Sequence, residues 1–214
     1  MIISGVMTKN PIFIHPDMTI NEVRSLMDKE KVGHLPVLDK NNNIVGLVTR
    51  KDILKAAPSA ATSLDMYEIS YLLSKMTVKD VMEKAVVTVG ENEVVEEAAR
   101  IMADNSIGCL PVMRGKLLVG IITDSDLFHV FLNAFGARHP GVRITCSIKD
   151  KPGQVARITQ AIAEKGGNLV AFVTSEGDDL SQRRATIKVT GINRTDAETI
   201  IRGLYDVQLE DIRD

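Results

Sequence analysis

The segment Gly-Leu-Val-Thr-Arg-Lys-Asp at residues 46–52 decides the fold, because it occurs again as Gly-Ile-Ile-Thr-Asp-Ser-Asp at residues 120–126. In both copies a glycine and two apolar residues precede a threonine, and an aspartate follows three residues after the threonine. Such apolar runs are typical of strands, and Thr-x-x-Asp is a pattern that begins helices. We therefore expect each copy to be a strand that leads directly into a helix.

Two further blocks repeat on the N-terminal side of these segments. Val-Met at residues 6–7 returns at residues 81–82, and Gly-His-Leu-Pro-Val at residues 33–37 returns as Gly-Cys-Leu-Pro-Val at residues 108–112. Their offset is 75 residues, one more than the offset of the first segment. The difference falls in the polar turn between Leu38 and Ile44, and turns tolerate such changes of length. Three blocks in register identify an internal repeat.

Each copy has the same predicted order of elements: strand, helix, strand, strand, helix. The sequence from Thr19 to Glu22 fits a capping box, and apolar residues at helical spacing follow it. Short apolar runs around a turn predict strand pairs at 35–38 and 44–48, and at 110–113 and 118–122. One copy is too small to bury its apolar face well, so the two copies are expected to pack as one pseudo-symmetric unit.

The repeat resembles a tandem pair of CBS domains, and the two Gly-x-x-Thr-x-x-Asp segments carry the resemblance. We expect CBS motif 1 at residues 1–60 and CBS motif 2 at residues 77–136. Between them, apolar residues recur every three or four positions from Met66 to Met76, which predicts a helical linker at residues 61–76.

The chain after the repeat has a different pattern. Residues 142–214 read as strand, helix, strand, strand, helix, strand. Asp-Lys-Pro-Gly at residues 150–153 and Gly-Asn-Leu at residues 167–169 make this segment similar to an ACT domain. The predicted fold class is α+β: a pseudo-symmetric CBS pair of two βαββα motifs, followed by a ferredoxin-like βαββαβ ACT domain. This arrangement is similar to that of stand-alone acetoin-utilisation-type regulators.

The threonine and aspartate of each repeated segment are candidate ligand-binding residues: Thr49 and Asp52, and Thr123 and Asp126. At the end of a strand and in the first turn of a helix, they face one cleft, where helix amides favour a phosphate. Aspartate can accept hydrogen bonds from two ribose hydroxyls, and threonine can bind a phosphate or ribose oxygen. The alternative is that each threonine only caps its helix, but two occurrences in a CBS-like repeat favour binding.

The resemblance implies further residues around each adenine. These are Asn10, Pro11, Gly33 and His34 in the first copy, and Val86, Val87, Gly108 and Cys109 in the second. Arg50 and Lys51 would offset a phosphate charge, whereas Asp124 would repel it. We therefore expect the first site to prefer AMP, ADP or ATP. The second is expected to be empty or to take an uncharged adenosyl group such as that of S-adenosylmethionine.

The ACT-like segment contains a candidate amino-acid site. Asp150 and Asn168 would bind the amino and carboxylate groups, with Pro152, Gly153 and Leu169 around them. In the alternative interpretation Asp150 caps the helix that Pro152 begins, and Asn168 supplies a turn. Both interpretations stay open.

The composition argues against several other classes. A net charge of −2 gives no basic surface for nucleic acid, and the 4% of aromatic residues include no tryptophan for base stacking. No leader and no membrane-spanning run is apparent, so we expect a cytoplasmic protein without membrane contact. Cys109 and Cys146 lie outside any CxxC spacing and are expected to be reduced and buried.

The expected function is that of a non-catalytic regulatory sensor of adenosyl ligands, NAD included. No nucleotide-hydrolase, serine-hydrolase or zinc-protease motif is present, and no histidine has metal-ligand spacing, so we expect no catalytic residue, metal or required cofactor. CBS pairs commonly dimerise, and ACT domains commonly pair with other ACT domains, which implies a homodimer. This homodimer is expected to act on an unknown protein partner. Two alternatives stay open: a structural or oligomerisation subunit with vestigial sites, and a nucleotide-hydrolysing enzyme that uses Asp52 or Asp126.

Overall fold

The computed structural model describes residues 1–56, 71 and 75–214. The predicted linker helix at residues 61–76 lies mostly outside the described residues. The chain divides into two compact units, Met1–Leu127 and Phe128–Asp214, and each unit has a hydrophobic core of its own. Among the described helices, none is long and apolar enough to span a bilayer.

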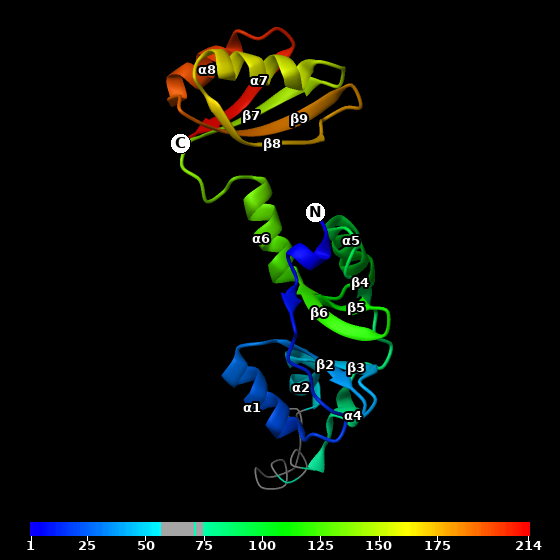
Figure 1. Ribbon diagram of the computed structural model, residues 1–214. Helices are drawn as coiled ribbons and strands as arrows, with labels where there is room; N and C mark the ends of the chain where they lie inside the picture. The colour runs from blue at the N-terminus through cyan, green and yellow to red at the C-terminus, as the bar shows by residue number, and fades with distance from the viewer. Residues whose placement is uncertain (57–70, 72–74) are drawn as a thin grey trace. The chain divides into compact units, whose positions relative to one another are not determined.

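The first unit contains two similar halves, at residues 1–56 and 75–127 (Figure 1). The elements of the first half are η1 (Ile3–Gly5), β1 (Thr8–Lys9), α1 (Ile20–Glu30), β2 (His34–Leu38), β3 (Ile44–Thr49) and α2 (Arg50–Ala56). The elements of the second half are α4 (Val78–Val81), β4 (Val89–Gly90), α5 (Val95–Asn105), β5 (Cys109–Arg114), β6 (Leu117–Thr123) and the first turn of α6 (Asp124–Ala134), a helix that continues past Leu127. The predicted strand pairs and the helices that follow them are confirmed.

Helix α1 begins and ends where its sequence directs. Thr19 and Glu22 form the predicted capping box, in which each side chain accepts a hydrogen bond from the other residue's backbone amide. The helix stops at Lys31, whose φ of 55° lies in the left-handed region. Between these ends the helix buries its apolar stripe of Ile20, Val23 and Met27. Burial of each such side chain stabilises the fold by about 1.5–3 kcal/mol.

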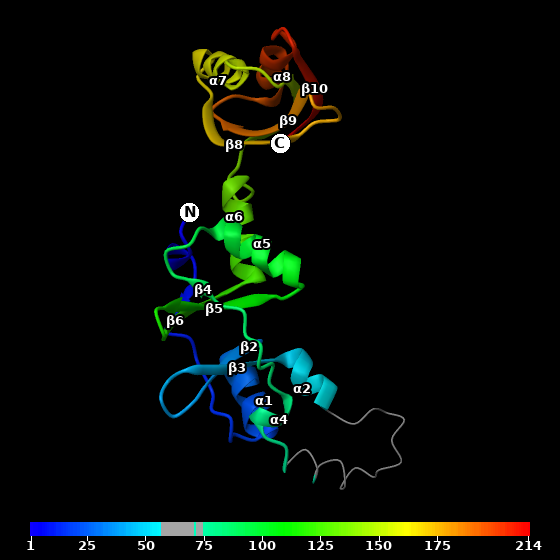
Figure 2. The same cartoon turned by 90° about the vertical axis from the view of Figure 1, so that its right-hand side faces the viewer.

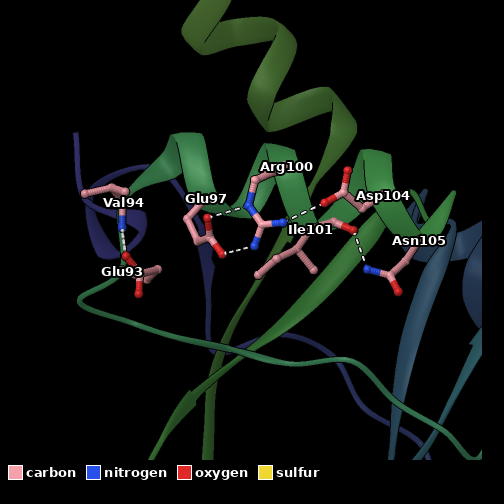
Figure 3. A network of polar contacts seen from close by, with 7 residues as sticks. All are labelled: Glu93, Val94, Glu97, Arg100, Ile101, Asp104 and Asn105. Atoms are coloured by element: carbon pink, nitrogen blue, oxygen red, sulfur yellow. Dashed lines mark hydrogen bonds and ion pairs between the residues drawn. The ribbon is translucent and has the colours of Figure 1, made fainter.

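Helix α5 carries a surface network on its exposed side (Figure 3). The guanidinium of Arg100 donates hydrogen bonds to Glu97, one turn earlier, and to Asp104, one turn later. Because exposed ion pairs of this kind contribute about 1 kcal/mol or less, the helix depends mainly on its buried residues, Val95, Ala98 and Met102.

A short segment near the start of each half pairs with a strand of the other half. Strand β1 pairs antiparallel with β6, so that Thr8 lies opposite Ile121. In the reciprocal position, Leu47 of β3 and Glu83 exchange two backbone hydrogen bonds of 2.9 Å. The larger sheet therefore has the order β1-β6-β5-β4, while β2 and β3 pair with each other. The two halves are thus joined by an exchange of backbone segments.

The glycine of each repeated segment makes room for a methionine of the other half. A Cβ built on Gly46 would lie 2.5 Å from Sδ of Met82, and one on Gly120 would lie closer still to Sδ of Met7. Such distances are below any that real Cβ atoms adopt. The repeated glycine and the repeated Val-Met block are therefore the two sides of one contact, which the unit makes twice.

We expect Gly120→Ala to lower the free energy of unfolding by about 1 kcal/mol, because the added methyl group displaces the flexible, half-buried side chain of Met7. Urea unfolding followed by circular dichroism measures this loss. Gly90→Ala is the matched control, since a Cβ at Gly90 would meet nothing within 4 Å. The double variant with Met7→Ala should recover part of the loss, and strict additivity of the two losses would contradict the proposed contact.

The second unit contains one four-stranded antiparallel sheet of order β10-β7-β9-β8. Its elements are β7 (Val142–Lys149), α7 (Gln154–Glu164), β8 (Asn168–Glu176), β9 (Gln182–Thr190), α8 (Arg194–Arg202) and β10 (Val207–Arg213). Figures 1 and 2 show both helices on the same face of this sheet. The predicted βαββαβ order is confirmed, although α7 starts two residues later than Pro152.

Alternate residues of the central strands form the core of the second unit. Ile144 and Cys146 of β7 pack with Ile187 and Val189 of β9, under the two helices. Cys146 and Cys109 are both free and buried, as predicted. Burial raises the pKa of both thiols to about 12, so they remain protonated at neutral pH.

Candidate ligand-binding clefts

A cavity of about 430 Å³ in the first unit lies where three segments from its two halves meet. Asn10 and Pro11 follow β1, Gly33 and His34 lie at the start of β2, and Thr123 ends β6. We call this cavity the Thr123 cleft. It falls within the range of about 300–1,000 Å³ that is typical of small-molecule sites.

The Thr123 cleft combines the predicted site residues differently from the sequence-based grouping. The sequence placed Asn10, Pro11, Gly33 and His34 with the threonine of their own repeat, whereas the structure places them beside Thr123 of the other half. The pairing of β1 with β6 of the other half is the reason, because it brings the residues after β1 close to the end of β6.

The threonine and aspartate of both repeats bind each other at the start of a helix. Oδ2 of Asp52 accepts hydrogen bonds from N and Oγ1 of Thr49, at 2.9 and 2.7 Å. Oδ2 of Asp126 accepts the same pair of bonds from Thr123, both at 2.8 Å. The amide of each aspartate donates back to the threonine hydroxyl, at 3.3 and 3.4 Å. Each threonine therefore caps its helix, which is the predicted alternative to ligand binding.

Capping does not exclude ligand binding, because it uses only one oxygen of each carboxylate. Within the described chain, Oδ1 of Asp52 and Oδ1 of Asp126 accept no hydrogen bond, and both residues are only partly buried. An acceptor with a fixed position and an open lone pair suits a ribose hydroxyl. The hydroxyl protons of Thr49 and Thr123, in contrast, are already donated, so neither threonine has a proton left for a phosphate.

The remaining predicted residues are those that the internal repeat makes equivalent to the residues around Thr123. Thr49 ends β3, and β3 is bonded to Glu83, three residues before Val86. Val87 is 37% exposed, while Gly108 is half-buried and Cys109, at the start of β5, is buried. The internal repeat makes these residues the sequence counterparts of those around Thr123, and we call them the Thr49 set: Thr49, Asp52, Val86, Val87, Gly108 and Cys109.

Arg50 does not line the Thr123 cleft, and its charge is already engaged. Its Nη1 binds Oδ1 of Asp28 at 2.6 Å, and its Nη2 donates to the carbonyl of Met27 at 2.9 Å. Arg50 lines a separate hollow of about 170 Å³ between α1 and α2, and Lys51 is exposed. This placement gives no support to the predicted use of Arg50 against a phosphate.

His34 lies near the point where the two halves meet. A Cβ built on Gly108 would come within 3.6 Å of Nε2 of His34 and 3.3 Å of Oδ2 of Asp124. Burial lowers the pKa of His34 and outweighs the opposite effect of the Asp124 and Asp52 carboxylates. The imidazole is therefore neutral at pH 7 and can take part in hydrogen bonds without adding charge to the cleft.

Several residues of the Thr123 cleft were not predicted as binding residues. Lys31 and Val32 come from the end of α1, Ile12 follows Pro11, and Ser125 follows Asp124. Val32 directly precedes the repeated block at residues 33–37, and Ser125 lies inside the repeated segment 120–126, at a position that differs between the copies. Ile12 adjoins no repeated block, so no repeat signal indicates it.

The predicted amino-acid site of the second unit has a different arrangement. Oδ2 of Asp150 accepts a hydrogen bond from Nε of Arg183 at 3.1 Å, and α7 starts at Gln154 after Gly153 with no side-chain cap. Capping of this helix by Asp150 is therefore wrong. Asn168 is exposed at the start of β8, and in the part of the chain that the structure describes no hydrogen bond joins it to Asp150. Leu169 packs against the core, and Pro152 is exposed.

Comparison with protein families gives two matches. The CBS domain model matches residues 3–59 and 78–133, which is more than half of the chain. The TTHA0829-like ACT domain model matches residues 140–213. A curated relative is the L-aspartate semialdehyde sulfurtransferase of Methanocaldococcus jannaschii, 28% identical over 131 residues, or 61% of this chain. The match covers only 23% of that relative's length.

Solved structures similar to this chain cover its CBS part. The putative acetoin utilization protein AcuB of Vibrio cholerae is 29% identical with a TM-score of 0.53, over 65% of this chain and 98% of its own. The CBS domain pair of protein MJ0100, in complex with 5′-methylthioadenosine and S-adenosyl-L-methionine, is 27% identical with the same TM-score and the same two coverages. CBSX2 in complex with AMP is 28% identical with a TM-score of 0.50, over 61% of this chain and 96% of its own.

Proposed function

Because this chain belongs to the CBS-domain family and ends in an ACT domain, we propose that it is a non-catalytic regulatory protein that senses an adenosyl ligand. The observation that carries the proposal is the Thr123 cleft, where residues of both halves surround a carboxylate-bearing helix start. Similar CBS pairs bind AMP, S-adenosylmethionine and 5′-methylthioadenosine.

In the proposed complex the ribose hydroxyls donate to Oδ1 of Asp126. The adenine lies against the backbone of residues 10–11 and 33–34, where peptide groups and apolar side chains offer hydrogen bonds and a flat contact. A ligand in this position touches both halves of the first unit at once. It therefore favours one packing of the halves over others, and a sensor requires such a difference in affinity between states.

The output of the sensor is a protein partner acted on in trans. The ACT domain contributes a second input, an amino acid bound near Asp150 and Asn168, and homodimer formation through the CBS and ACT domains completes the device. Binding at either domain signals only if it changes the affinity for the partner, and the coupling is then reciprocal.

A thermal-shift screen of the full chain tests the proposal. We expect AMP, ADP, ATP, NAD, 5′-methylthioadenosine or S-adenosylmethionine at about 100 times the dissociation constant to stabilise the fold by about 2.7 kcal/mol, a rise of several degrees in melting temperature. GMP is the control for the base. No rise with any adenosyl compound would favour a structural subunit with vestigial sites, and phosphate release from ATP with magnesium would favour a hydrolase.

A further inference from the structure

We propose that Asp124 determines the ligand class of the Thr123 cleft: an adenosyl compound whose 5′ group carries a positive charge, such as a sulfonium, in preference to an adenosine 5′-phosphate. The inference rests on the proposed function, because it concerns the same cleft.

Asp124 is held at the wall of the cleft by its backbone. It is the first residue of α6, and its amide donates to the carbonyl of Gly108 at 2.9 Å. Its Oδ1 accepts a hydrogen bond from Ser125 at 3.3 Å, and its Oδ2 points toward Gly108. Within the described chain no lysine, arginine or histidine forms an ion pair with this carboxylate. Asp124 therefore presents an uncompensated negative charge to the cleft.

The other charged groups do not cancel this effect. Lys31 is the second charged residue that lines the cleft, and like Asp124 it is exposed to solvent, so it offsets one negative charge at most. Asp126, in the same turn as Asp124, adds a second carboxylate beside the ribose site. His34 is neutral at pH 7 because burial lowers its pKa. A phosphate near the start of α6 would thus meet two carboxylates and one exposed ammonium.

A zwitterionic 5′ group fits the same set of charges. A sulfonium or ammonium beside Asp124 replaces repulsion by attraction, and Lys31 offers a cation for the carboxylate of an amino-acid tail. The charges of the cleft therefore match a compound of the S-adenosylmethionine type, with both signs present at its 5′ end.

The first half has the opposite sign at the equivalent position. Arg50 occupies it, and its amide donates to the carbonyl of Gly33 at 3.0 Å, as that of Asp124 does to Gly108. The guanidinium of Arg50 turns to Asp28 on α1. This backbone hydrogen bond is thus the same in both halves, and the two positions differ in the charge of the side chain.

Isothermal titration calorimetry of the full chain tests the inference, in an Asp52→Ala background that removes the ribose acceptor of the Thr49 set. We expect S-adenosylmethionine to bind more tightly than AMP. Asp124→Asn should reduce the ratio of the AMP dissociation constant to the S-adenosylmethionine dissociation constant by about tenfold, mainly through tighter AMP binding. Asp124→Arg, which introduces the residue of the first half, should shift the ratio further in the same direction.

Asp104→Asn is the matched control, since it removes one negative charge at an exposed position of α5 paired with Arg100. An equal change of ratio in this control would overturn the inference, because net charge would then explain it. An unchanged ratio in both Asp124 variants would also overturn it while the sensor function stands. Failure of every adenosyl compound to bind the unmodified chain would instead refute the proposed function itself.

Discussion

Asp126→Ala is expected to weaken adenosyl-ligand binding by about 10- to 100-fold. The carboxylate has one oxygen committed to Thr123 and one left open, and the open oxygen is the proposed acceptor for the ribose hydroxyls. Hydrogen bonds to a charged acceptor contribute about 1.5–3 kcal/mol, which corresponds to this range of affinity. Calorimetric titration with the tightest ligand of the thermal-shift screen measures the loss.

The chain offers a matched control for this variant. Asp80 forms the same capping box with Thr77 at the start of α4, with bonds of 2.9 and 2.8 Å, but Thr77 does not line the Thr123 cleft, whereas Thr123, the partner of Asp126, does. Asp80→Ala therefore removes an equal cap and should leave affinity unchanged. If it weakened binding as much as Asp126→Ala, helix stability and not ribose contact would explain the effect, and the proposed role of Asp126 would be wrong.

The elements that local sequence controls were predictable. The capping box at Thr19 and the alternation along β9 both depend on neighbours within a few residues, and such signals appear in the sequence itself. The start of α7 shows the limit of this approach. Pro152 is a typical first residue of a helix, but Gly153 adopts a φ of 87°, and the helix begins only after it.

The exchange between the halves could not be predicted. Strand β1 has only two residues, too few to show a period, and its partner lies more than a hundred positions away. The strand of its own half offers the same Gly-x-x-Thr pattern as the strand it actually pairs with. Because the two partners look alike locally, only the packing of Met7 on Gly120 and of Met82 on Gly46 distinguishes them, and that packing is tertiary.

The candidate site was predictable in its residue types but not in their combination. The repeated Thr-x-x-Asp segments identified both carboxylates, since the spacing is local. The ion pair of Arg50 could not be anticipated, because its partner, Asp28, lies on a different helix, 22 residues earlier. The environment of His34 likewise depends on Asp124 of the other half, which no spacing within its own motif could indicate.

Ile187→Ala is expected to destabilise the second unit by about 2–5 kcal/mol. Ile187 is fully buried in the central strand β9, between Ile144 of β7 and Phe172 of β8, so the smaller side chain leaves a cavity in the middle of the core. Ile192→Ala, which removes the same atoms from a half-buried position, should lower the free energy of unfolding by less than Ile187→Ala does.

The two compact units make this variant informative about how the chain unfolds. Because each unit has its own core, calorimetry should resolve two unfolding transitions. Ile187→Ala should lower the midpoint temperature of only one of them. An adenosyl ligand should raise the midpoint temperature of the other transition by the same amount in the variant and in the unmodified chain, because the Thr123 cleft lies wholly within the first unit. If the variant lowered both transitions together, the units would unfold as one cooperative block, and the ACT domain would then stabilise the ligand-binding unit directly.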